Sequence, residues 1–289
     1  MRLPGAWRHR DVSANGIRLH LAESGTGPLV LLLHGFPEFW WTWRRQLTAL
    51  AESGYRAVAV DLRGCGDSDK PPRGYDGWTL AGDVAGLVKA LGARRAHLVG
   101  HGWGGLVAWT AAALHPRLVA SVSTLAAPHP LELRRRPPAP RHLLAAQLPI
   151  WPERWLTADG AAAVQRLLLA WSAVPPAAEV LARTRQAMSV PGVAHCSLEY
   201  LRWAFRSRLR GDGRQFAQAM RRRLTVPVLT VAGRLDPCVR VAAVQGSARW
   251  VDGPFTHHCL DGVGHFPHRE APEQVTELLL AQLLRAGPG

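Results

Sequence analysis

A turn of small residues between two apolar runs carries the clearest chemical meaning in this sequence. Residues 96–99 are typical of a short buried strand, and residues 106–114 are typical of a helix. Between them stands Gly100-His101-Gly102-Trp103-Gly104-Gly105. A strand, a sharp turn and a helix form a nucleophile elbow, which holds a reactive side chain above the end of a sheet. Small residues at 100 and 104 permit the turn, but the nucleophile position is Gly102, which has no side chain.

Strands and helices alternate on both sides of this turn. Residues 8–23 contain two expected antiparallel strands. Further strands are predicted at residues 28–33, 56–60, 119–125, 226–232 and 255–260, and further helices at 43–53, 79–91, 239–246 and 272–284. This order predicts an α/β protein with a mostly parallel sheet flanked by helices. Thr79 is the expected N-cap of its helix.

The alternation breaks once. Residues 131–222 are rich in Arg, Pro, Leu, Ala and Trp, have helical periodicity and contain no convincing strand. We therefore expect three segments: the first part of an α/β core at residues 1–130, an inserted helical cap at 131–222, and the second part of the core at 223–289.

Composition narrows the class of protein. The 289 residues are 47% hydrophobic and 19% charged, which is ordinary for a globular chain. No apolar run is long enough to span a membrane, and the first residues lack the apolar core of a signal peptide, so we expect a cytoplasmic protein. The cysteines are scattered without CxxC spacing and suit free thiols (Cys65, Cys196, Cys238 and Cys259). With no metal-ligand spacing and no nucleotide or flavin motif, we expect no metal and no cofactor.

The net charge of +14 comes almost entirely from arginine, with clusters at residues 134–136, 206–214 and 221–223. A solvated surface is the ordinary interpretation of such runs. Docking to an acidic protein or an anionic substrate is the alternative. No nucleic-acid-binding module is present, so we expect no nucleic acid partner. We expect a monomer or a homodimer that acts on a small hydrophobic substrate.

Four motifs together identify a family resemblance. They are His34-Gly35-Phe36-Pro37, the elbow, Gly233-Arg234-Leu235-Asp236-Pro237 and Gly264-His265-Phe266, each at the end of a predicted strand. In this order they resemble the α/β-hydrolase superfamily, and within it the branch of epoxide hydrolases and haloalkane dehalogenases. The resemblance implies an α/β-hydrolase fold: an eight-stranded, mostly parallel sheet with a helical cap.

The resemblance also implies roles for individual residues. His265 matches the catalytic base, and Asp236 matches the acid that orients it; such a carboxylate fixes the imidazole tautomer and stabilises the imidazolium. The backbone N–H groups of Phe36 and Trp103 match an oxyanion site. We expect the substrate pocket to be lined by residues of the motifs and of the cap (His34, Pro37, Trp40, His101, Trp151, Trp155, Tyr200, Leu201 and Phe266). We interpret His34 as orienting its loop rather than as a base.

Two departures separate this chain from the relatives it resembles. Those enzymes carry aspartate at the elbow, in Gly-His-Asp-Trp-Gly-Gly, and its carboxylate opens the epoxide; Gly102 cannot do so. They also use a pair of cap tyrosines to protonate the epoxide oxygen. Tyr200 is the only tyrosine in residues 131–222 and stands one place from the family position, a rotation of about 100° on a helix.

Three functions remain open. The first is a hydrolase in which His265 activates water for direct attack. The second is a non-hydrolytic tailoring enzyme that performs cyclisation, elimination or proton transfer on a hydrophobic intermediate. The third is an inactive relative that binds a ligand or a protein, including a variant whose nucleophile was removed by engineering. We favour catalysis because Asp236, His265 and the oxyanion loop are all retained.

Overall fold

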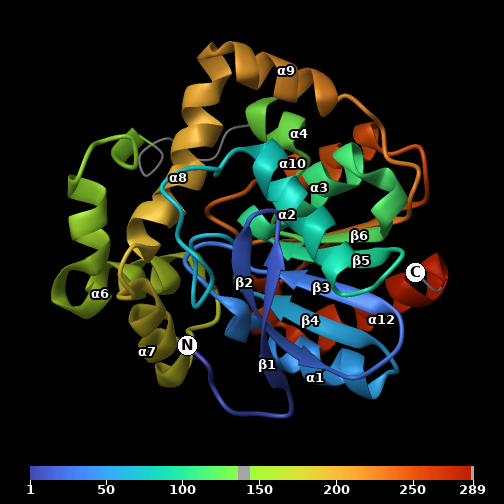
Figure 1. Ribbon diagram of the computed structural model, residues 1–289, viewed down its shortest axis with the longest axis horizontal. Helices are drawn as coiled ribbons and strands as arrows, with labels where there is room; N and C mark the ends of the chain where they lie inside the picture. The colour runs from blue at the N-terminus through green and yellow to red at the C-terminus, as the bar shows by residue number, and fades with distance from the viewer. Residues whose placement is uncertain (136–143, 288–289) are drawn as a thin grey trace.

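The computed structural model describes residues 1–135 and 144–287. Its centre is one eight-stranded sheet with the strand order β1-β2-β4-β3-β5-β6-β7-β8 (Figure 1). The pairs β1/β2 and β2/β4 are antiparallel, and the other neighbours are parallel. The strands are β1 (Arg8–Ala14), β2 (Ile17–Ser24), β3 (Leu29–Leu33), β4 (Arg56–Val60), β5 (Ala96–His101), β6 (Val119–Leu125), β7 (Val228–Gly233) and β8 (Phe255–Leu260). The α/β fold class predicted from the sequence is confirmed.

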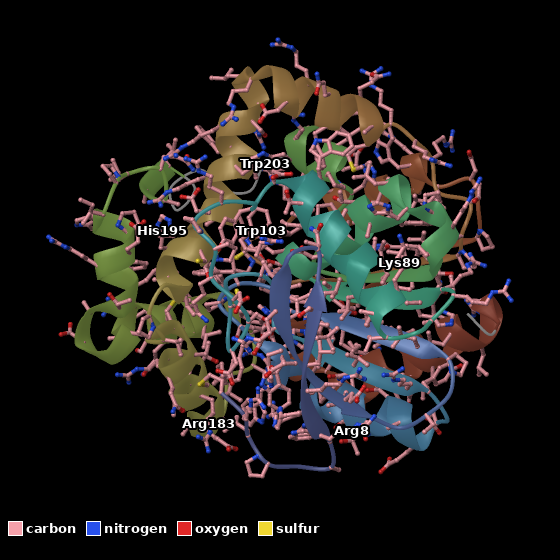
Figure 2. All side chains as sticks on the ribbon, viewed as in Figure 1. Arg8, Lys89, Trp103, Arg183, His195 and Trp203 are labelled. Carbon is pink, nitrogen blue, oxygen red and sulfur yellow. The ribbon has the colours of Figure 1, made fainter. Side chains whose placement is uncertain are left out.

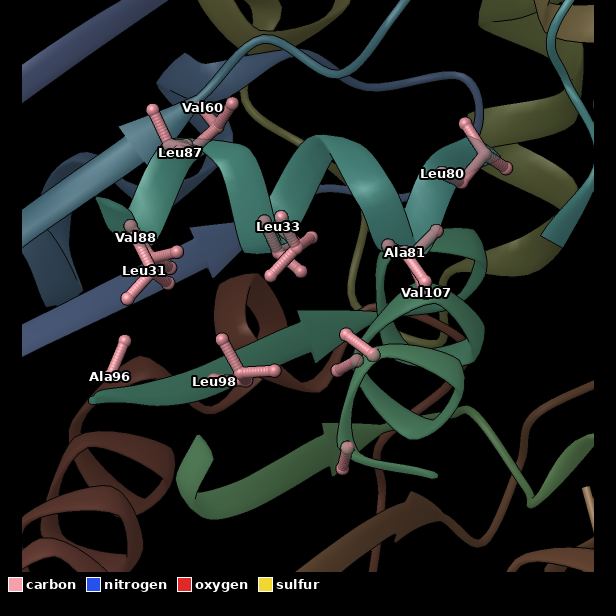
Figure 3. Packing of buried hydrophobic residues seen from close by; sticks show 14 of the residues in the cluster. Leu31, Leu33, Val60, Leu80, Ala81, Leu87, Val88, Ala96, Leu98 and Val107 are labelled. Atoms are coloured by element: carbon pink, nitrogen blue, oxygen red, sulfur yellow. The ribbon is translucent and has the colours of Figure 1, made fainter. Parts of the chain in front are cut away.

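Helices cover both faces of the sheet because the central strands are apolar on both sides. Along β3, Leu31 and Leu33 pack in one buried cluster, whereas Val30 and Leu32 pack in another, as the two-residue period of a strand requires. Figure 3 shows Leu31 and Leu33 beneath α2 (Gly77–Ala90), beside Leu98 of β5. The same face carries α3 (Trp103–Leu114) and α10 (Val241–Gly246), and the opposite face carries α1 (Arg44–Glu52) and α12 (Pro272–Ala286).

The start of α2 differs from the prediction. Its N-cap is Asp76, whose side chain accepts the N–H of Thr79 at 2.9 Å, so the helix begins at Gly77 rather than after Thr79. A second carboxylate oxygen of Asp76 accepts the Thr79 hydroxyl at 2.7 Å. Asp76 and not Thr79 is therefore the N-cap. Aspartate commonly takes this position because its carboxylate accepts the free N–H groups of the first turn.

A helical segment joins β6 to β7. It comprises α4 (Pro130–Arg135), α6 (Trp151–Trp171), α7 (Ala178–Met188), α8 (Val193–Arg206), the 3-10 helix η3 (Ser207–Leu209) and α9 (Gly211–Ala219). In Figure 1, α6, α7 and α8 lie together on one side of the sheet, and α9 continues from α8 above it. The domain boundaries at residues 131 and 222 stay a prediction. No helix in residues 1–135 and 144–287 is long and apolar enough to cross a membrane.

Candidate active site

The turn after β5 brings the backbone into unusually close contact with its surroundings. A Cβ on Gly100 would overlap the backbone of Gly104, and a Cβ on Gly104 would overlap the backbone of Leu33. These two glycines therefore let α3 start immediately beside the sheet. Gly102, the N-cap of α3, has φ +50° and ψ −114°, a conformation that favours glycine but that nucleophile elbows impose on other residues.

Gly102 differs from these neighbours because it has open space around it. A Cβ built on Gly102 would lie 3.7 Å from the Cα of Gly35 and 3.9 Å from Nε2 of His265, both ordinary van der Waals contacts. Crowding therefore does not require glycine here. A side chain at this position would face the imidazole of His265.

His265 and Asp236 are in direct contact. They follow the neighbouring parallel strands β8 and β7, whose carboxyl ends lie at the same edge of the sheet. His265 Nδ1 lies 2.9 Å from Asp236 Oδ2. Asp236 Oδ1 accepts the N–H groups of Cys238 at 2.7 Å and Val239 at 3.0 Å, which fixes the carboxylate. With Nδ1 bonded to the carboxylate, the proton-accepting nitrogen of a neutral His265 is Nε2, which faces Gly102.

The loop that carries His265 is held by backbone contacts to the helical segment. The His265 N–H donates to the carbonyl of Trp171, the last residue of α6, at 2.8 Å. Glu270 Oε2 accepts the N–H of Gly264 at 2.9 Å and that of Ala173 at 2.7 Å. One carboxylate therefore connects the histidine loop to the chain that follows α6.

A buried polar network lies behind the same loop. His101 Nε2 lies 2.8 Å from the carbonyl oxygen of His265, and His101 Nδ1 lies 2.8 Å from Glu38 Oε2. His268 and Arg269 each place a nitrogen 3.4 Å from Glu38 Oε1. Burial would raise the pKa of Glu38, but its electrostatic interactions with His268, His101 and Arg269 hold that pKa well below its usual range. Glu38 is therefore the ionised centre of this network.

Two backbone donors are available near Gly102. The N–H of Phe36 and the N–H of Trp103 have no acceptor among residues 1–135 and 144–287. Trp103 is the first residue of α3, where an N–H has no partner inside the helix. Phe36 follows Gly35, whose Cα lies within contact distance of position 102.

A cavity of about 380 Å³ opens from this point between the sheet and the helical segment. Gly102 and His265 form part of its wall, and almost all of the remaining wall is apolar. Three of the pocket residues predicted from the sequence line it: Trp151, Trp155 and Leu201. The core side adds Phe36 and Trp103, and Figure 2 shows Trp103 close to α8, the helix that carries the labelled His195 and Trp203.

Three other predicted pocket residues line a separate, smaller pocket of about 20 Å³, namely His34, Pro37 and Tyr200. The Tyr200 hydroxyl donates to the carbonyl of Arg63 at 2.7 Å, away from the larger cavity. Nδ1 of His34 lies 2.9 Å from the carbonyl oxygen of Gly35, and Nε2 of His34 accepts the N–H of Leu62 at 3.1 Å. Burial lowers the pKa of His34, so its neutral imidazole joins two loops.

The remaining three predicted residues, Trp40, His101 and Phe266, line neither of these pockets. Trp40 is completely buried, and its indole N–H donates to the carbonyl of Met1 at 3.0 Å. Phe266 packs behind His265, with ring centroids 5.1 Å apart. His101 and Phe266 therefore support His265 from behind, whereas Trp40 packs elsewhere in the core.

Two clusters of described residues could offer metal ligands: Glu38/His101/His268 and Asp236/Cys238/His265. In the first, Arg269 already supplies positive charge beside Glu38. In the second, Asp236 is occupied by His265 and two backbone N–H groups, and burial raises the pKa of the Cys238 thiol, which opposes the thiolate form that metals bind. The positive charge of Arg269 in the first cluster and the occupied carboxylate in the second both disfavour a bound cation.

Comparisons with known proteins agree with this geometry. Residues 28–272 match a family described as the alpha/beta hydrolase fold. The chain belongs to the α/β-hydrolase family. It is 32% identical to epoxide hydrolase A of Mycobacterium tuberculosis, over 96% of this chain and 97% of that protein. It is also 32% identical to epoxide hydrolase 3 of Xenopus tropicalis, over 92% of this chain and 74% of that protein.

Solved structures of epoxide hydrolases share this fold. Epoxide hydrolase A from Mycobacterium thermoresistibile superimposes with a TM-score of 0.83 at 30% identity, over 96% of this chain and 98% of that one. An epoxide hydrolase from an endophytic Streptomyces gives a TM-score of 0.84 at 29% identity, over 98% and 97% of the two chains. This protein is thus an epoxide-hydrolase-like α/β-hydrolase with glycine at its elbow.

Several residues around the site were not singled out in the sequence. Glu38 directly follows the His34-Gly35-Phe36-Pro37 motif, and Glu270 lies five residues after His265. Their proximity to these motifs could have indicated that both lie near the site. Cys238, which follows Asp236-Pro237, lines the large cavity. Arg208 also lines it, and nothing local in the sequence distinguishes that arginine from the others in its cluster.

Proposed function

We propose that this α/β-hydrolase cleaves hydrophobic substrates by direct attack of a water molecule that His265 activates. The observation that carries the proposal is the space beside Gly102, where a Cβ would lie 3.9 Å from His265 Nε2, in the wall of an apolar cavity. A histidine oriented by a carboxylate is an effective general base, typically worth 10²- to 10⁴-fold in rate. A glycine elbow excludes a covalent intermediate at residue 102.

The chemical step uses the groups around Gly102. A water beside Gly102 gives one proton to Nε2 of His265 while its oxygen forms a bond to the carbonyl carbon of an ester. The tetrahedral intermediate then collapses: the C–O bond to the alcohol breaks, and the leaving oxygen takes the proton back from the His265 imidazolium. Asp236 stabilises the imidazolium that forms. The N–H groups of Phe36 and Trp103, which have no acceptor among the described residues, stabilise the oxygen on which negative charge develops.

This arrangement favours an ester over an epoxide. The carbonyl oxygen of an ester can accept both backbone N–H groups, and its tetrahedral intermediate needs no proton donor at that oxygen. Opening of an epoxide is faster when an acid protonates the ring oxygen. The hydroxyl of Tyr200 donates to the carbonyl of Arg63 and belongs to the smaller pocket. We therefore expect activated esters to be turned over faster than aryl epoxides.

The test is a panel of nitrophenyl esters and aryl epoxides, measured with the protein and with two variants. His265→Ala should lose the ester hydrolysis that the protein performs. Gly102→Asp places a carboxylate where the Cβ contacts are ordinary, and it should gain attack on epoxides. If the unchanged chain hydrolyses neither class while Gly102→Asp opens epoxides, direct hydrolysis is wrong and the non-hydrolytic or binding functions gain support.

A further inference from the structure

We infer that Arg208 is an anion-binding residue in the substrate cavity, so that the preferred ligand is an amphipathic acid with an apolar body and a carboxylate. The inference deepens the proposed function, on which it rests for the identity of the cavity as the substrate site. Among the described residues that line the cavity, Arg208 is the one that carries a permanent charge, and the wall around it is otherwise almost entirely apolar.

Arg208 has no counter-ion among the residues that the structure describes. Its Nε is buried without a hydrogen-bond partner, and no carboxylate among residues 1–135 and 144–287 forms an ion pair with it. The acids that flank Leu133 and Arg208 in the sequence pair with other arginines: Glu132 Oε1 lies 3.7 Å from Arg135 and 3.9 Å from Arg249, and Asp212 lies 2.9 Å from Arg210. Residues 136–143 contain no aspartate or glutamate in the sequence, so they supply no missing carboxylate.

A second arginine increases the local positive charge. Arg134 of α4 follows Leu133, which lines the same cavity, and Arg134 Nη1 donates to the carbonyl of Gly213 at 3.1 Å. Burial and the positive charge of Arg134 both lower the pKa of Arg208. Arg134 therefore adds positive charge near Arg208, and an anion bound to Arg208 would reduce the repulsion between them.

The chemistry of the wall defines the ligand. A guanidinium binds a carboxylate with charge-assisted hydrogen bonds, often two in parallel. The aromatic and aliphatic residues of the same cavity, such as Trp151, Trp155 and Leu156, take a hydrocarbon body. A neutral compound of the same size would leave the buried Nε of Arg208 without a hydrogen-bond partner. The cavity should therefore bind the acid more tightly than its neutral amide.

The test compares octanoate with octanamide, and decanoate with decanamide, by isothermal titration calorimetry. Each pair matches in length and differs in charge, and binding needs no turnover, so a catalytically silent protein can still be tested. We expect the acid to bind at least about tenfold more tightly than the amide, the effect of one charge-assisted hydrogen bond. Arg208→Gln should abolish this preference, and Arg208→Lys should retain part of it. Arg166→Gln removes an exposed arginine of α6 and should change nothing.

Three results would overturn the inference. One is the absence of any preference for the acid at either length, including no binding of either compound. Another is an equal loss of preference in Arg166→Gln, which would indicate a general effect of net charge. The third is a preference that survives in Arg208→Gln and disappears in His265→Gln, which would place the carboxylate at the Gly102 turn. Thermal unfolding of each variant verifies that it is folded. Binding that matches expectation without ester turnover would leave Arg208 supported and the proposed hydrolysis wrong.

Discussion

His101 Nε2 contacts the backbone carbonyl of His265 at 2.8 Å, so the residue that precedes the glycine elbow supports the loop of the histidine that faces it. On its other side, His101 lies 2.8 Å from Glu38. The three elements of the site, namely the elbow, the loop after β3 and the loop after β8, therefore meet at one fully buried imidazole.

Removal of this imidazole should destabilise the protein. In His101→Ala the carboxylate of Glu38 and the carbonyl of His265 each lose a close neighbour in a site without solvent, and the missing ring leaves a cavity. We expect the free energy of unfolding in urea to fall by about 3 kcal/mol, as is typical when a large buried side chain is truncated to alanine. The control is Arg45→Ala, which removes a pair with Glu273 between two exposed side chains and should cost less than about 1 kcal/mol. Equal losses would contradict a structural role for the network.

Gly102 and Gly104 should respond differently to alanine. A Cβ on Gly102 meets ordinary contacts, so Gly102→Ala should cost about 1–2 kcal/mol, mainly from its positive φ. A Cβ on Gly104 would overlap the backbone of Leu33, and Gly104→Ala should unfold the protein or cost well over about 3 kcal/mol. Urea denaturation of the two variants measures both. A Gly102→Ala variant as unstable as Gly104→Ala would mean that glycine is structurally required at the elbow.

Glu270 should affect turnover more than binding. Its carboxylate accepts the N–H groups of Gly264 and Ala173 and so positions the loop of His265 without touching the cavity. In Glu270→Gln we expect kcat for ester hydrolysis to fall about tenfold or more with little change in KM, because a misplaced base slows the chemical step. Glu273→Gln, on the exposed side of α12, is the matched control. A rise in KM at unchanged kcat would contradict this role.

Stability should decline as the pH falls below neutral. Burial lowers the pKa of His129 to about 3 and that of His97 to about 4, compared with 6.5 for an unburied histidine. Both groups have a depressed pKa in the folded state, so the stability that they contribute is present above pH 6.5 and is lost as the pH falls toward the folded values, because the unfolded chain binds the protons first.

One histidine can be tested by itself. Replacing His129 with phenylalanine removes one group that takes up a proton when the chain unfolds. It keeps an aromatic ring beside Trp250, whose ring stacks on that of His129 with the centroids 4.9 Å apart. The slope of unfolding free energy against pH between about pH 6 and 4 should decrease by up to about 1.4 kcal/mol per pH unit. An unchanged slope in His129→Phe would show that His129 is not the neutral buried group inferred here.

The order of strands and motifs was sufficient to predict the fold and the position of the elbow, because these depend on local periodicity and on glycine. The same order also predicted that Asp236 and His265 follow consecutive strands. These strands are β7 and β8, which pair side by side in the sheet. This order could not predict contacts between segments that are far apart in the sequence. The Tyr200 hydroxyl bonds to Arg63, Trp40 is buried against Met1, and Arg208 lines the cavity without a counter-ion among the described residues. Each of these depends on how helices pack on the core, which no local pattern records.

The central claim is that His265 activates water directly and that no covalent intermediate forms. Stopped-flow measurement of nitrophenol release from an activated ester tests it. We expect a linear time course without a burst, and a rate at least about a hundredfold lower in His265→Ala, the loss expected when a general base is removed. A burst of one equivalent of nitrophenol, or hydrolysis that persists at full rate in His265→Ala, would contradict it.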